Sequence, residues 1–138
     1  LNDSKKKLDF ENEEREKDII KPSKYTPSDN ETEKLIGVPR AHLSGCELDS
    51  VKSYMLNKLI NHAGTISYLS RMLDVSVSTI NGWVLRKAIS KKGAIIVSFN
   101  DNLNRTFTPL LLRPDLTLSD IDKYTKQVKT QIDIDVNK

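Results

Sequence analysis

Large apolar residues recur at steps of three and four along the chain from residue 48 onward. The first run predicts an amphipathic helix that ends at Gly64. A second helix follows with Thr65 as its cap, and a third begins at Ser76 or Ser78 and extends to about Lys87. The apolar positions of the three helices are, in order, Leu48, Val51, Met55, Leu56, Leu59 and Ile60, then Ile66, Leu69, Met72 and Leu73, and last Ile80, Trp83 and Val84.

Two further elements follow the third helix. Ser90 can cap a fourth helix over "SKKGAIIVSFN". The stretch "AIIVSF" taken alone also fits a strand, but the cap and the continuity with "SKKG" favour a helix. Thr108 followed by Pro109 predicts one more short helical turn, so residues 46–116 hold five short helices and form a small all-α domain. The fourth helix is expected to bury Ile95, Ile96 and Phe99.

Residues 1–45 differ from this segment because they mix charges of both signs with three prolines and few large apolar side chains. Such a composition does not form a core by itself, so we expect a charged flexible N-terminal extension. The alternative is a short docked helix that Pro22 ends, with one apolar side made of Leu8, Phe10, Ile19 and Ile20.

Residues 117–138 predict a C-terminal helix with Ser119 as its cap. This helix either packs on its own domain or pairs two protomers as a dimerisation element. One helical face holds Leu118, Ile121, Tyr124 or Thr125, Val128 and Ile132.

Composition restricts the chain to one core, because 138 residues with 37% hydrophobic side chains suit a single domain with tails. The net charge of +3 is unevenly placed: residues 46–116 carry nine basic and five acidic side chains. Residues 65–92 alone hold five basic side chains against Asp74. The middle segment therefore carries the positive excess, which suits a polyanionic partner; the alternative is that these charges only form a solvated face.

Several classes of chemistry are not supported by these residues. Cys46 is the only cysteine and no apolar run approaches a membrane span, which together indicate a reducing, cytoplasmic setting without membrane contact. His42, Cys46 and His62 lack a compact metal-ligand spacing, so we expect no metal. We also expect no enzyme and no cofactor, since a glycine-rich phosphate loop, a His-centred nucleophile and paired carboxylates are all missing.

The second and third helices match the core pattern of a helix-turn-helix. That motif needs an apolar residue near the end of its first helix, a tight turn, and two buried residues three apart on its second helix. Glycine is common in the turn, and Asp74 is among the few other residue types that tolerate a left-handed conformation. The matching positions are Leu73, Asp74, Val75, Ile80 and Trp83.

This register turns short, mostly hydrogen-bonding side chains outward on the third helix, residues 77–87. Such side chains let a helix enter the major groove, where hydroxyls and amides address base edges and a methyl group contacts thymine. The alternative is that the serines and threonines only cap and expose a helix end. The candidate base-reading residues are Ser76, Val77, Ser78, Thr79 and Asn81.

Phosphate contacts are expected on both sides of this helix. Lys and Arg beside a recognition helix neutralise phosphates, and the amides that begin the preceding helix can add a contact. The candidate phosphate-binding residues are Thr65, Ser67, Arg86, Lys87, Lys91 and Lys92.

The stretches "LDVSVSTINGW", "ISKKGA" and "LLLRPDL" follow one another in an order and spacing that resembles the small phage and prophage DNA-binding proteins of the Cro and YdaS-antitoxin type. The resemblance covers residues 48–116 and implies a lambda-repressor-like helical domain. It also implies that Arg113, Pro114 and Asp115 end the domain, with Asp115 as a local cap or ion-pair partner and not a catalytic acid.

The sequence therefore favours a DNA-binding transcriptional regulator, a repressor in most such proteins, of a bacterium, phage or mobile element. Its partners would be double-stranded DNA and a second copy of the chain, since a homodimer suits a palindromic operator. One alternative is an antitoxin or adaptor that holds a protein partner through residues 1–45. Another is a nonspecific DNA-binding accessory protein.

Overall fold

The structure is a computed structural model, and it describes residues 26–136. This part of the chain is all-α and contains no strand, so the helical interpretation of "AIIVSF" is confirmed. The elements are α1 (Asp29–Glu33), the 3-10 turn η1 (Arg40–His42), α2 (Gly45–Ala63), α3 (Ile66–Leu73), α4 (Val77–Arg86), α5 (Lys91–Ser98), α6 (Pro109–Leu112) and α7 (Leu118–Val136).

Hydroxyl caps begin the α-helices, because a side-chain oxygen satisfies one of the amides that the first turn leaves unpaired. The predicted caps Thr65, Ser90 and Thr108 are in place, and Ser76 rather than Ser78 caps α4. The predicted cap of α7 is wrong. Thr117, two residues before Ser119, accepts from the Asp120 amide at 3.0 Å, and the Asp120 carboxylate accepts from the Thr117 amide at 3.2 Å.

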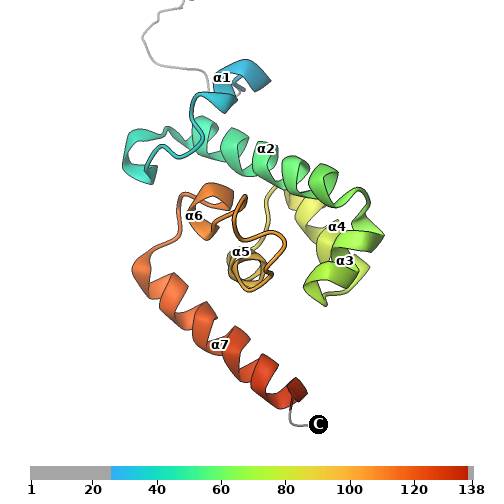
Figure 1. Ribbon diagram of the computed structural model, residues 1–138. Helices are drawn as coiled ribbons and strands as arrows, with labels where there is room; N and C mark the ends of the chain where they lie inside the picture. Colours follow the sequence, from blue (N-terminus) through green and yellow to red (C-terminus); the bar gives the residue numbers. More distant parts are fainter. Residues whose placement is uncertain (1–25, 137–138) are drawn as a thin grey trace, which may run out of the picture.

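The helices surround α5, which Figure 1 shows nearly end-on at the centre of the molecule. Helix α2 lies along one side, α3 and α4 lie at one end of α2, and α7 runs along the side away from α2. α5 packs against α6 and α7, while α2 packs against α1, α3 and α6. The largest fully buried side chains are Trp83, Phe107, Leu56, Leu59, Leu69, Ile80, Ile89, Ile95, Leu103, Leu112, Val51 and Val97.

Gly93 allows α5 to lie against Trp83. A Cβ atom at Gly93 would lie 2.6 Å from Cζ2 of Trp83 and 2.9 Å from Cγ1 of Ile89, and both of these side chains are buried. Those distances are well inside van der Waals contact, so no other residue fits without displacing the core. The contact between α5 and the Trp83 side chain of α4 therefore depends on this glycine.

Two predicted core residues lie on the surface. Val84 is 41% exposed because it sits one helical position beyond Trp83, on the flank of α4. Phe99 is 38% exposed because it is the C-cap of α5, past the last buried turn. The connection between α5 and α6 supplies Leu103 and Phe107 to the core instead.

The sequence predicted a flexible extension over residues 1–45, but its described part, residues 26–45, packs against the helical domain. Leu35 and Ile36 pack against the core, Thr32 is 2% exposed, and the Tyr54 hydroxyl of α2 donates a hydrogen bond to Glu33. Residues 26–45 therefore belong to the same packed unit as α2. The alternative docked helix, with Leu8, Phe10, Ile19 and Ile20, lies outside the described residues.

Candidate nucleic-acid interface

Helices α3 and α4 are joined by a three-residue connection that hydrogen bonds fix in place. Asp74 adopts the left-handed conformation, with φ 55° and ψ 46°, as the sequence predicted. The Val75 amide donates to the Ser70 carbonyl at 3.1 Å, and the Ser70 hydroxyl donates to the Val75 carbonyl at 2.6 Å. Ser70 therefore ties the turn to α3, and the two helices are held at a defined angle.

Burial of Ile80 and Trp83 decides which side of α4 faces solvent. Both side chains are at most 1% exposed. Because successive helical residues are about 100° apart, the opposite side is centred on Ser78, Asn81 and Leu85. Leu85 is 84% exposed, and the list of candidates drawn from the sequence omitted it. The same helical period that placed Trp83 inside could have placed Leu85 outside.

All five candidate base-reading residues are exposed, but they are not equivalent. The Ser76 hydroxyl accepts from the Thr79 amide at 3.0 Å and hydrogen-bonds the Thr79 hydroxyl at 2.8 Å. These two hydroxyls are thus engaged with each other at the start of α4. Ser78 and Asn81 make no side-chain hydrogen bond to another residue of the described chain, and Val77 lies beside them.

The candidate phosphate-binding residues also divide into two groups. The Thr65 hydroxyl accepts from the Tyr68 amide at 3.0 Å as the cap of α3, and Ser67 is exposed in the first turn. Three cations are exposed: Arg86 as the last residue of α4, Lys87 as its C-cap, and Lys92 in the first turn of α5. The exposed cations therefore lie at the C-terminal end of α4 and at the start of α5, whereas the capped amides lie at the start of α3.

Arg86 lies along its own helix over Gly82. A Cβ atom at Gly82 would be 3.3 Å from Nη1 of Arg86, so the missing side chain leaves room for the guanidinium. Arg86 forms no ion pair with another described residue and remains available to an anion.

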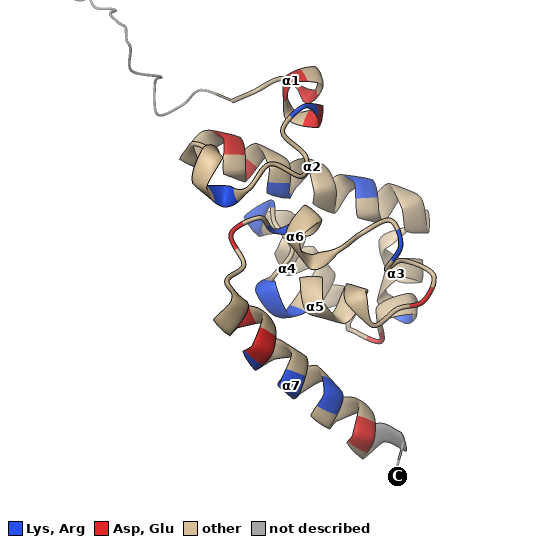
Figure 2. Cartoon of the chain, turned by 60° about the vertical axis from the view of Figure 1, so that its left-hand side comes forward, with Lys and Arg blue, Asp and Glu red and all other residues tan. Residues whose placement is uncertain are grey.

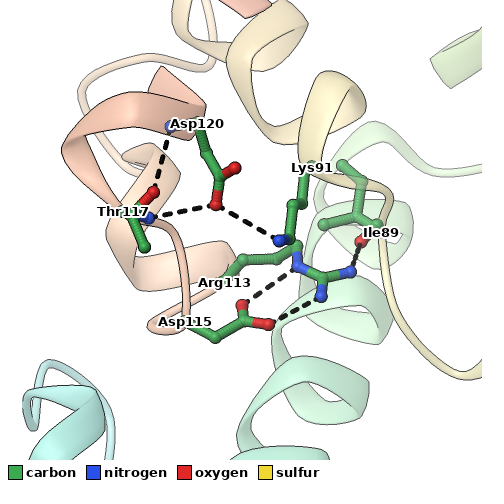
Figure 3. Close-up of polar contacts among 6 residues, drawn as sticks. All are labelled: Ile89, Lys91, Arg113, Asp115, Thr117 and Asp120. Atoms are coloured by element: carbon green, nitrogen blue, oxygen red, sulfur yellow. Dashed lines mark hydrogen bonds and ion pairs between the residues drawn. The ribbon is translucent and has the colours of Figure 1, made fainter. Parts of the chain in front are cut away.

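Lys91 differs from the other cations because it already has an acidic partner. Its ammonium lies 3.2 Å from the Asp120 carboxylate, which joins the start of α5 to the start of α7 (Figure 3). The Thr117 amide and the Lys91 ammonium both donate to this carboxylate and hold the pKa of Asp120 below its ordinary value. A phosphate at Lys91 would have to compete with Asp120.

The "LRPDL" stretch has a structural role in the same region. The Arg113 guanidinium donates to both carboxylate oxygens of Asp115, at 3.1 and 2.8 Å, and to the Ile89 carbonyl at 2.8 Å (Figure 3). Partial burial raises the pKa of Asp115, but the Arg113 hydrogen bonds and charge outweigh it and leave that pKa lowered. The geometry agrees with the ion-pair role that the family resemblance implies for Asp115.

Helix α7 does not extend the positive surface. Figure 2 shows acidic and basic residues of α7 interspersed along its length. The helix packs on α5, with Val128 buried and Ile121 against the core. Leu118, Ile132 and Ile134 stay exposed, so contact with its own domain uses only part of the apolar surface of α7.

Comparisons with known proteins give no relative. No family model matches the chain, and searches of curated proteins and of solved structures found no similar protein. The resemblance to Cro and YdaS-type proteins therefore remains a prediction from the residues themselves.

The described residues meet neither the requirements of a membrane-spanning helix nor those of a metal site. Within residues 26–136, no helix combines the length and the apolar character needed to cross a membrane. In the same part of the chain, no three His, Cys, Asp or Glu side chains gather where they could hold a metal ion.

Proposed function

We propose that this protein binds double-stranded DNA sequence-specifically and regulates transcription, with α4 entering the major groove. The observation that carries the proposal is the outward side of α4. It presents Ser78, Asn81 and Leu85 on a helix that two buried side chains and a left-handed turn hold in place. Short polar side chains on a rigid helix suit base-edge contacts, because they let the helix axis come close to the bases.

Under this hypothesis, each outward residue of α4 makes a different kind of contact with the bases. Asn81 has the donor and acceptor that pair with adenine, and Ser78 can donate or accept at either kind of base edge. Leu85, like Val77, offers an apolar contact to a thymine methyl group. Because Ser76 and Thr79 are occupied with the cap, we assign most of the sequence discrimination to Ser78, Asn81 and Leu85.

Affinity would come from the exposed cations at the end of α4 and the start of α5. Arg86, Lys87 and Lys92 are exposed and would neutralise phosphates, which positions the protein without reading sequence. The capped start of α3 at Thr65 and Ser67 would add amide donors on the other side of the groove. Lys91 contributes less in this assignment, because Asp120 already neutralises it.

A regulator of this kind acts in the cytoplasm on the nucleoid, most often as a repressor that occupies a promoter. We propose that it binds as a homodimer on an inverted repeat, and that the exposed apolar residues of α7 join the two copies. The two roles expected for α7 are then compatible, because Val128 faces its own domain while Ile132 and Ile134 are exposed.

The test is selection of bound duplexes from a random pool, followed by competition between the enriched site and a scrambled one. We expect Asn81→Ala to cost roughly 1 to 3 kcal/mol on the enriched site and much less on the scrambled one. Asn30→Ala, at an exposed asparagine of α1, is the matched control and should bind both duplexes as the parent does. Equal losses on both duplexes would assign Asn81 to the backbone, and failure of the pool to enrich any site would refute sequence-specific binding.

A protein-interaction module, such as an antitoxin or adaptor, is the second candidate. This hypothesis is favoured by the apolar side chains exposed on α4, because Val77 and Val84 are each 41% exposed and lie beside the exposed Leu85. Under that hypothesis Leu85→Asp would abolish partner binding, whereas loss of Arg86 and Lys87 would have little effect. The random-pool selection separates the two candidates, because a protein-interaction module enriches no site.

A further inference from the structure

A polar cleft of about 890 Å³ lies between α1, α2 and the end of α4. Its α2 wall contains Asn57, Lys58 and Asn61, and its α4 wall is formed by Arg86 and Lys87. None of these residues except the last two entered the candidate interface drawn from the sequence. The cleft is therefore a second concave surface that shares two cations with the α4 surface.

The charges in this cleft favour an anionic ligand. Lys58, Arg86 and Lys87 form no ion pair with another residue of the described chain, so their charges are uncompensated. Lys52 also lines the cleft, but it is paired with Asp49 at 3.6 Å. Asp49 and Asp29 are the acidic side chains among the lining residues.

The shape of the cleft suits an extended anion better than a compact one. Its lining runs along α2 from Cys46 to Asn61, which at 1.5 Å per helical residue is about 22 Å. One strand of a duplex carries a phosphate about every 3.4 Å along the axis, so several phosphates fit this length. The amides of Asn57 and Asn61 add neutral hydrogen-bond donors between the cations.

We propose that this cleft binds the sugar–phosphate backbone of the duplex next to the bases that α4 reads. Lys58, Arg86 and Lys87 contact phosphates, and Asn57 and Asn61 donate to phosphate oxygens. The inference rests on the proposed DNA binding, and it adds α2 as a backbone-binding element. One duplex reaches both surfaces because Arg86 and Lys87 form the end of α4 and one wall of the cleft.

The first experiment compares Lys58→Ala with Lys129→Ala in the full chain, because Lys129 is an exposed lysine on α7 outside the cleft lining. Binding to the enriched duplex is measured by fluorescence anisotropy over a range of salt concentrations. Lys58→Ala is expected to weaken binding several-fold and to reduce the logarithmic salt slope by about one. Lys129→Ala is expected to match the parent in both quantities.

The second experiment uses Cys46 as a reporter, because this only cysteine lines the cleft and is partly exposed. The rate of alkylation of its thiol is measured with and without saturating duplex. The bound duplex is expected to slow alkylation several-fold. A duplex too short to extend past the bases that α4 reads should give less protection.

The outcomes separate this proposal from the proposed function. If the parent binds no DNA, both proposals are overturned. If Asn81→Ala weakens binding to the enriched duplex much more than to the scrambled one, but Lys58→Ala behaves as Lys129→Ala and Cys46 is not protected, only the cleft proposal is overturned. A tighter duplex affinity in Lys58→Ala would also overturn it.

Discussion

Gly93→Ala should destabilise the protein even though alanine is the better helix former. Within α5 the exchange gains up to about 1 kcal/mol from helix propensity. Against this, the new methyl group would sit 2.6 Å from Cζ2 of Trp83 and 2.9 Å from the Ile89 side chain, and both neighbours are buried. Overpacking of a filled core costs about 1 to 3 kcal/mol, so after the propensity gain is subtracted we expect a net loss of up to about 2 kcal/mol.

Gly82→Ala is the matched control, because Gly82 is also inside a helix. Its nearest neighbour for a new Cβ is the Arg86 guanidinium at 3.3 Å, at the far end of an exposed side chain that can move away. This variant should therefore keep most of the propensity gain of about 1 kcal/mol.

The two glycine variants are compared with the parent by thermal and urea denaturation followed by circular dichroism. For a domain of this size, 1 kcal/mol corresponds to a change in Tm of about 4 °C. We expect a lower Tm for Gly93→Ala and a higher Tm for Gly82→Ala. If both variants raise the Tm, α5 does not pack against Trp83 as described.

Three further predictions concern the core and the contacts around α7. Trp83→Ala should cost about 3 to 5 kcal/mol in urea denaturation, because a fully buried indole leaves a cavity, and an unchanged midpoint would place Trp83 outside the core. Arg113→Lys should lower the free energy of unfolding by about 1 to 3 kcal/mol, since an ammonium cannot reproduce the three hydrogen bonds to Asp115 and Ile89. A variant as stable as the parent would mean that these guanidinium hydrogen bonds do not stabilise the fold. The pKa of Asp115 is lowered in the folded state, so its contribution is complete above about pH 4 and is lost as the pH falls through the lowered pKa. Melting curves from pH 2 to 7 should show a weaker acid dependence for Asp115→Asn than for the parent, and identical profiles would contradict this linkage.

Most of the helical framework was predictable because its signals are local. The hydroxyl caps, the apolar spacing and Asp74 in the turn are each set by a few neighbouring residues. Val84 and Phe99 were misplaced because both lie at the edge of an apolar stripe. Whether such a residue is buried depends on which other helix packs beside it. The apolar pattern of one helix does not determine its neighbours.

The irregular segments carried less information. Leu103 and Phe107 are buried but lie in the connection between α5 and α6, which has no helical periodicity, so the apolar spacing did not predict their burial. The packing of residues 26–45 rests on contacts of Leu35 and Ile36 with distant helices, which the charged composition around them concealed. Among the candidate site residues, exposure was predictable, but the partner of Lys91 was not, because Asp120 lies 29 positions away in the sequence.

The way α4 is anchored has a consequence for how this protein can diverge. Two inward residues, Ile80 and Trp83, and the tied turn at Asp74 hold the helix, whereas Ser78, Asn81 and Leu85 are not needed for its packing. Surface substitutions at such positions usually change stability by no more than about 0.5 kcal/mol. Descendants of this gene could therefore exchange the three outward residues one at a time, each step remaining folded, and acquire new binding preferences without rebuilding the scaffold.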